Sequence, residues 1–222
     1  MTNEESPLKF VPFQKQIVAV AALSLIVGMG AVRGRADTPA GSFASVDMEE
    51  VAKNSTVFTK NNADLKTFVD NLQGINARLG EGSAIFLPNA QLIELESLYE
   101  KTGPSDADKK RIAELEGIVD ARKGEVSRLE STATPTDDQK KRYRELTDLQ
   151  TAGKDNLTKL VDGFRKRISD REEELTAKTL KTIRAAIADV AKSKSISLVF
   201  DSKVAIYSAN DITPDVIKQV NK

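Results

Sequence analysis

Residues 195–222 read SISLVFDSKVAIYSANDITPDVIKQVNK, and in this stretch the sequence pattern changes from helix to strand. Ile196, Leu198 and Phe200 occupy alternate positions, and a polar Ser-Lys pair separates them from a second apolar run at 204–207. The pattern predicts two short strands joined by a tight turn. A hairpin alone is marginally stable in water, so we expect it to pair with another strand of this chain or with the same hairpin of a second subunit.

A short helix is expected after the hairpin. Thr213 suits the position that caps a helix at its N-terminus, and Pro214 suits the first helical position because that residue needs no backbone N–H donor. Val216, Ile217 and Val220 would dock the helix. Residues 194–222 are therefore expected to form a small body of β-hairpin and terminal helix.

The run VFDSKVAIY followed by NDITPDVIKQVNK resembles the C-terminal signature of the Skp/OmpH family of periplasmic chaperones. In that family a two-stranded segment ending in an Asp-Ile-Thr helix start completes a trimerisation body. Near the front of the chain, FASVDMEEV at 43–51 is similar to the family's first strand and first helix. Between these two stretches the chain resembles the family only in general character, because both have a long charged helical region.

The resemblance implies a mainly α fold with a small β body, in which a first strand at 43–46, after a linker from residue 37, joins the C-terminal hairpin. A long helical coiled-coil arm, residues 47–193, would project from that body. The resemblance also implies a homotrimer that acts as an ATP-independent holdase, binding unfolded outer-membrane proteins in the periplasm and preventing their aggregation. The expected oligomerisation core consists of Phe43, Val46, Ile196, Leu198, Phe200, Val204 and Ile206.

Residues 1–36 have the pattern of an export signal. Lys9 and Lys15 precede an apolar run of 16 residues from Ile17 to Val32. That length is near the upper end for a signal-peptide core and short of the roughly 20 residues that span a bilayer, so we expect cleavage after Ala36. The alternative is an uncleaved anchor in the inner membrane.

A helix is predicted from Asp47 to Leu79, because Glu50 three residues after Asp47 completes a capping-box pattern at its start. Apolar side chains then recur every seven residues, which is typical of a coiled-coil seam: Val51, Phe58, Leu65, Leu72 and Leu79. Asn54, Ser55, Asn61 and Asn62 stand at apolar positions in the first half of this seam. We expect a polar, hydrated stretch there.

The arm is expected to break near 80–88, 102–105 and 132–136, where Gly or Pro interrupts the helical pattern. The second and third breaks begin a repeat, since Pro-Ser-Asp at 104–106 recurs 31 residues later as Pro-Thr-Asp. Ser105 with Asp108, and Thr136 with Gln139, would cap the two following helices. One duplication is too few for a solenoid, so the repeat predicts two successive helices joined by corners.

From Thr136 a helical pattern persists to about Ser193, which corresponds to about 87 Å of helix. Such a helix is too long to be buried in a compact domain. The second half of the arm seam is expected at Leu157, Leu160, Phe164 and Ile168, which keep a three-four spacing. The charged runs at 165–167 and 172–174 are expected to lie on the solvated side.

Composition excludes several classes of activity. The chain has no Cys and no His, which removes thiol nucleophiles, Ser-His pairs and the usual zinc sites. It contains no Gly-rich phosphate loop and no dinucleotide motif. We therefore expect no enzymatic activity, no cofactor and no metal.

The balance of charge gives no reason to expect nucleic acid as a partner. Lys and Arg number 33, and so do Asp and Glu, while residues 1–36 hold four basic and two acidic groups. The remaining chain is slightly acidic, whereas phosphate binding needs a basic surface. The family's best-known members are strongly basic, and this chain departs from them in charge and in the three breaks of its arm.

A second function from a different class fits the same sequence features. A structural coiled-coil protein of the envelope, tethered to the inner membrane by an uncleaved N-terminal segment, would also need long charged helices. Retention of residues 1–36 in the native protein would favour it.

Overall fold

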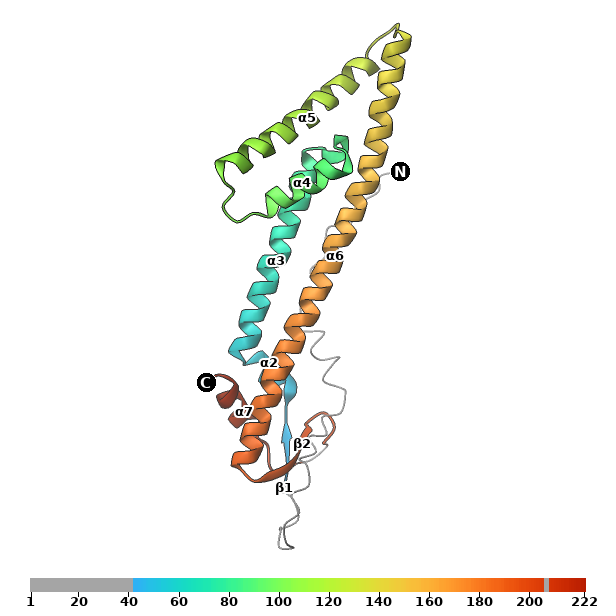
Figure 1. The fold of residues 1–222 in the computed structure, drawn as a ribbon. Helices are drawn as coiled ribbons and strands as arrows, with labels where there is room; N and C mark the ends of the chain where they lie inside the picture. Colours follow the sequence, from blue (N-terminus) through green and yellow to red (C-terminus); the bar gives the residue numbers. More distant parts are fainter. Residues whose placement is uncertain (1–41, 206–207) are drawn as a thin grey trace. The chain divides into compact units, whose positions relative to one another are not determined.

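The computed structural model describes residues 42–205 and 208–222. Its elements follow one another as β1 (Ser42–Val46), α2 (Met48–Lys53), α3 (Thr56–Glu81), the 3₁₀ turn η1 (Ala84–Phe86), α4 (Asn89–Glu100), α5 (Asp106–Glu130), α6 (Asp137–Ser193), β2 (Ile196–Asp201) and α7 (Thr213–Val220) (Figure 1). The fold is mainly α with one small sheet, as the sequence predicted. The expected export signal at 1–36, the linker that follows it and Ile206 lie outside the described residues.

The chain divides into two units. Phe68–Ile168 forms one unit, called here the corner unit because it contains the turns between α3, α4, α5 and α6. The described residues before and after that range form the other, called here the strand unit because it contains β1 and β2. The helices α3 and α6 contribute residues to both.

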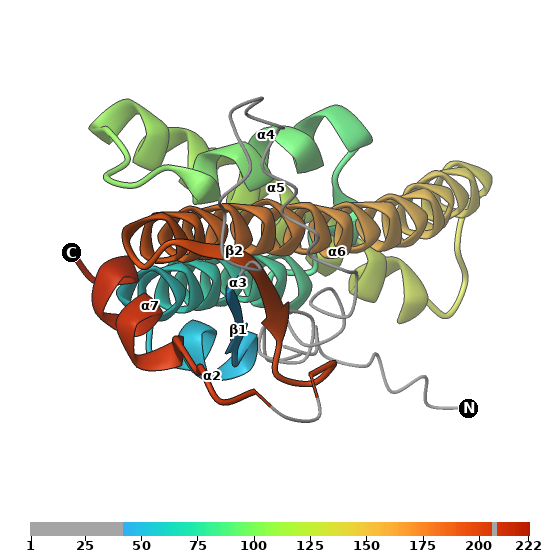
Figure 2. The same cartoon turned by 90° about the horizontal axis from the view of Figure 1, so that it is seen from below.

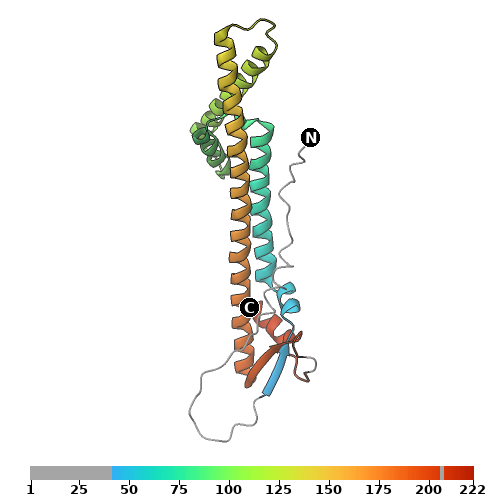
Figure 3. The same cartoon turned by 90° about the vertical axis from the view of Figure 1, so that its right-hand side faces the viewer.

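In the strand unit β1 is the central segment. It pairs in parallel with β2, with Phe43 opposite Leu198 and Ser45 opposite Phe200, and the two strands lie side by side in Figure 3. On its other edge the Ser45 N–H donates to the Asn210 carbonyl, and the Ser45 carbonyl accepts from the Ile212 N–H, both at 2.9 Å. Both edges of β1 are therefore occupied by chain segments from beyond residue 195.

The predicted hairpin is wrong in the part of it that the structure describes. The backbone N–H groups of Val204 and Ala205 donate to the Asp201 carbonyl at 2.9 and 3.1 Å, which makes a turn where the second strand was expected. The described residues that follow, from 208 on, reach the far edge of β1, where Asp211 bridges to Ser45. Alternation along a sequence identifies a strand but does not say which strand pairs with it.

The first helical segment is also shorter than predicted. The Asp47 carboxylate accepts from the Glu50 N–H at 2.9 Å, which confirms the predicted helix start. However, α2 ends at Lys53 and α3 begins at Thr56, so the helix expected without interruption from 47 to 79 is wrong at this point. The Ser55 hydroxyl accepts from the Phe58 N–H at 3.2 Å and so caps a new helix.

The terminal helix α7 begins one residue earlier than predicted, with Thr213 inside it. The Thr213 hydroxyl accepts from the Asp47 N–H at 2.8 Å and donates to the Asp211 carboxylate at 2.6 Å. The start of α7 is thereby tied to the start of α2, and the two helices lie close together in Figure 2. Val216 of α7 is fully buried, as a docking residue should be, whereas Ile217 and Val220 are half-buried.

In the corner unit the three interruptions fall where Gly and Pro occur. Helix α3 gives way to α4 between Glu81 and Asn89, α4 to α5 between Glu100 and Asp106, and α5 to α6 between Glu130 and Asp137. Gly103 in the second interruption has a φ of +83°, which glycine adopts without strain. Helix α6 has 57 residues and is about 86 Å long, as the sequence pattern predicted.

A small apolar cluster fixes η1 inside the corner unit. Phe86, Val126 and Leu146 are buried together, with Ile85, Leu129 and Tyr143 packed against them. The Arg122 guanidinium donates to the Phe86 carbonyl at 2.7 Å. This cluster joins η1, α5 and α6.

Candidate functional site

Three exposed apolar side chains gather on the strand unit, and we call them the aromatic patch: Phe43, Phe200 and Val204. They are 59%, 37% and 70% exposed. The two rings are stacked, with centroids 6.3 Å apart. Together with Ala44, Ala205 and residues 208–210 they line a depression of about 530 Å³.

The remaining residues of the expected oligomerisation core lie differently. Val46 and Ile196 are buried within the single chain, and Leu198 is half-buried. Ala44 and Val199 share the buried face of the strands, although the sequence placed Val199 on the outer side. A register irregularity between Ser42 and Phe43 explains why both Ile196 and Val199 face inward.

An ion-pair cluster fixes the turn beside the aromatic patch. The Glu49 carboxylate forms ion pairs with the Nζ atoms of Lys203 at 2.8 Å and of Lys53 at 2.7 Å. The hydrogen bond from Lys203, and next that from Lys53, lower the pKa of Glu49 to about 2. The turn after β2 is therefore tied to α2.

The predicted seam of the arm is apolar and largely buried. Val51, Phe58, Leu65, Leu72 and Leu79 are all buried. On the α6 side Phe164 is buried, whereas Leu157, Leu160 and Ile168 are half-buried.

The polar stretch of this seam is not hydrated at Asn61, contrary to the prediction. Asn61 is 1% exposed, and its amide donates to the Thr179 hydroxyl at 2.9 Å and to the Leu175 carbonyl at 3.3 Å. Ser55 is buried as well, and only Asn54 and Asn62 keep contact with solvent. Asn61 therefore joins α3 to α6 by buried hydrogen bonds within the strand unit.

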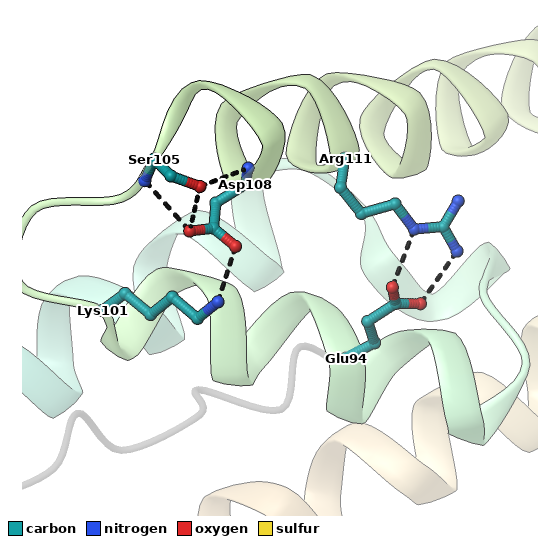
Figure 4. Close-up of polar contacts among 5 residues, drawn as sticks. All are labelled: Glu94, Lys101, Ser105, Asp108 and Arg111. Atoms are coloured by element: carbon teal, nitrogen blue, oxygen red, sulfur yellow. Dashed lines mark hydrogen bonds and ion pairs between the residues drawn. The ribbon is translucent and has the colours of Figure 1, made fainter.

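The corner between α4 and α5 combines a cap with ion pairs, as Figure 4 shows. Ser105 and Asp108 form the predicted capping box, and Lys101 donates to Asp108 at 2.6 Å. Arg111 on α5 binds both oxygens of Glu94 on α4, at 2.7 and 2.9 Å. Hydrogen bonds from Arg111 lower the pKa of Glu94.

The corner between α5 and α6 repeats this arrangement 31 residues later. Thr136 and Gln139 exchange the predicted cap hydrogen bonds, at 2.8 and 3.3 Å. Arg142 binds both oxygens of Glu125, each at 2.9 Å. In both corners the arginine and glutamate are 17 positions apart, a repeated spacing that the sequence contains and that the cap motifs alone do not indicate.

A groove of about 730 Å³ lies within the corner unit, between α3, the end of α4 and α6. Two arginines line it, and each lies over a ring. The Cζ atom of Arg78 is 3.5 Å from the Tyr99 ring centroid, and that of Arg167 is 5.9 Å from the Phe68 centroid. Phe68 and Tyr99 are both half-buried, so the groove has a partly aromatic lining.

A family model of OmpH-like outer membrane proteins matches residues 42–220. The chain belongs to the OmpH-like family. The matched range begins in β1 and ends in α7, so it includes both strands and all the helices of the structure. The resemblance inferred from the two ends of the chain is confirmed. No curated protein and no solved structure matches the chain.

The OmpH-like family is associated with periplasmic chaperones of outer-membrane proteins, and its members are chaperones rather than enzymes. The described parts of this OmpH-like chain hold no group of three or more side chains suited to bind a metal ion. In the same ranges, 42–205 and 208–222, no helix combines the length and the apolar character that a membrane crossing requires.

Proposed function

We propose that this OmpH-like protein is an ATP-independent holdase that binds unfolded outer-membrane proteins in the periplasm and prevents their aggregation. The family match from β1 to α7 supports the proposal most directly, because it covers the strands together with the long helices. Binding without ATP needs no catalytic centre. It needs extended surface with many weak apolar and charged contacts, which can hold a chain without selecting one sequence.

Assembly into a homotrimer is part of this proposal. The aromatic patch exposes two large rings next to a valine, and exposed apolar groups of this kind favour contact with another protein surface. Three copies that bring their patches together would bury these side chains. The predicted oligomerisation core would then consist of Phe43, Leu198, Phe200 and Val204, with Val46 and Ile196 supporting it from inside each chain.

The holdase activity is tested with an unfolded outer-membrane β-barrel protein diluted from denaturant in the absence of ATP. We expect residues 37–222 at stoichiometric excess to suppress the rise in light scattering, and to do so equally when ATP is added. Unchanged aggregation at that excess would overturn the proposal.

Export is tested on the native protein. We expect N-terminal sequencing to find Asp37 as the first residue of protein from the periplasmic fraction, because the apolar run is short for an anchor. An intact Met1 in the membrane fraction would support the alternative of a tethered structural protein.

A further inference from the structure

The groove of the corner unit has the size of a binding site for one or two large side chains. Its volume of about 730 Å³ lies within the range of ordinary ligand sites. Leu72 and Ile75 of α3 form its apolar floor, and Phe68 and Tyr99 supply its rings. The groove is open to solvent along α3, where Asn71 is exposed.

The two arginines of the groove are held in place by their neighbours. Arg167 donates to Glu96 at 3.2 Å and to Glu100 at 2.6 Å. Arg78 lies on the Tyr99 ring and is 3.9 Å from Glu116. Because both positive charges are compensated by carboxylates, the groove is a poor site for an anion.

Both guanidinium groups remain accessible. One face of Arg78 is used by Tyr99, and two rings lie near Arg167, Phe68 at 5.9 Å and Phe164 at 5.8 Å. The Arg78 side chain is nevertheless 53% exposed, and that of Arg167 is 42% exposed. The face of an aromatic ring is negative and is attracted to a guanidinium plane. A further ring entering the groove would therefore meet an accessible guanidinium group that already lies beside an aromatic ring.

We propose that this groove binds aromatic side chains of an extended, unfolded polypeptide. The inference rests on the proposed function, because it assigns a binding site to the holdase. Electrostatic complementarity between the guanidinium planes and a ring selects aromatic over aliphatic side chains. Outer-membrane β-barrels carry girdles of aromatic residues at both membrane interfaces, so their unfolded chains offer such rings.

The test compares two synthetic unstructured peptides of equal length and charge, one with Phe and Tyr and the other with Leu at the same positions. Their affinities for residues 37–222 are measured by fluorescence anisotropy. We expect the wild type to bind the aromatic peptide about fivefold more tightly than the Leu peptide, in line with the strength of ring and cation–π contacts.

Variants then locate the site. Arg78→Lys and Arg167→Lys keep the positive charge but remove the planar face, so both should bring the affinity ratio close to one. Tyr99→Leu should do the same. Tyr143→Leu is the matched control, because both tyrosines are half-buried but Tyr143 does not line the groove. The Tyr99 hydroxyl donates to Glu116 at 2.7 Å, and the Tyr143 hydroxyl donates to Glu130 at 3.1 Å.

Circular dichroism establishes that each variant is folded, and the two lysine variants keep the test decisive if Tyr99→Leu does not fold. Loss of the aromatic preference in the groove variants but not in Tyr143→Leu supports the site. A preference that persists in both lysine variants, or a wild type that does not distinguish the peptides, overturns it. The aggregation assay on the wild type is read separately, so failure of the groove and failure of the holdase proposal are distinguished.

Discussion

At the scale of single residues, Gly153 lets α6 lie directly against the backbone of another segment. A Cβ atom at this position would lie 1.8 Å from the carbonyl oxygen of Ile85 and 2.5 Å from its carbonyl carbon. Such a contact is far too short, and the obstacle is backbone that cannot rotate away. The missing side chain of Gly153 therefore lets η1 lie against α6.

We predict that Gly153→Ala lowers the free energy of unfolding by about 1–3 kcal/mol, as overpacking in a close contact does. Urea denaturation followed by circular dichroism measures it. Gly163→Ala in the same helix is the control, because nothing lies within 4 Å of its Cβ position, and alanine there should stabilise by up to about 1 kcal/mol. Equal stabilisation by both substitutions would contradict the close approach.

Asn61 shows how a polar residue can be satisfied inside an apolar seam. Asn61→Leu should change stability little, because the Thr179 hydroxyl still donates to the Leu175 carbonyl at 2.9 Å. Asn61→Asp should destabilise by about 3 kcal/mol, since it buries an uncompensated charge. Thermal unfolding measures both, with Asn71→Asp on the exposed side of α3 as the control. A large loss of stability in Asn61→Leu would contradict this, because it would mean that the hydrogen bonds of the Asn61 amide add substantially to the free energy of unfolding.

At the scale of elements, the two corners of the corner unit have the same arrangement of cap and ion pair. Each begins with Pro, a capping pair and an arginine that binds a glutamate on the preceding helix. The pairs Glu94–Arg111 and Glu125–Arg142 are partly exposed, so each should contribute modestly. The geometry of both is bidentate, which favours a measurable contribution.

We predict coupling energies of about 0.5–1 kcal/mol for each of these pairs, equal within error, from double-mutant cycles that combine Arg→Met with Glu→Gln. The coupling should fall at high salt because both pairs face solvent. The ion pair between Lys109 and Asp106 is the control. The Asp106 carboxylate is fully exposed, so the coupling energy of this pair should be close to zero. No coupling at either arginine would show that the caps alone hold the corners.

The sequence predicted where helices and strands begin and end better than it predicted which of them lie together. Caps and breaks are local, so Ser105, Thr136 and the Gly and Pro positions indicated them correctly. The family resemblance indicated that the 43–46 strand joins the C-terminal segment, and the structure agrees. The parallel pairing of β1 with β2 and the absence of the expected hairpin partner depend on residues more than 150 positions apart, which no local pattern contains. The same holds for the groove, whose rings and arginines come from three helices.

At the scale of the whole molecule, the aromatic patch is the feature that bears on assembly. We predict that Phe200→Asp and Val204→Asp convert the proposed trimer to monomers while the helix content stays near that of the wild type, because both side chains are exposed in the single chain. Sedimentation velocity and circular dichroism measure the two properties. Holdase activity should fall with the loss of assembly.

Ile93→Asp is the matched control for that experiment, because Ile93 is an equally apolar side chain, 49% exposed, on α4 of the other unit. It should leave the oligomeric state unchanged. A Phe200→Asp variant that sediments as the wild type does would place the assembly surface elsewhere on the molecule.

The central position of β1 has a consequence for the order in which the protein forms. Its partners come late in synthesis, since the Asn210 side chain donates to the Phe43 carbonyl across 167 positions, whereas the corner ion pairs span 17. Contacts close in sequence form first, and distant ones must wait for the chain between them. The corners can therefore fold as the chain emerges, but β1 stays unpaired until residues 196–213 have been made. A chain interrupted before that point would carry folded corners and no strand unit, and it could not enter an assembly built on the aromatic patch.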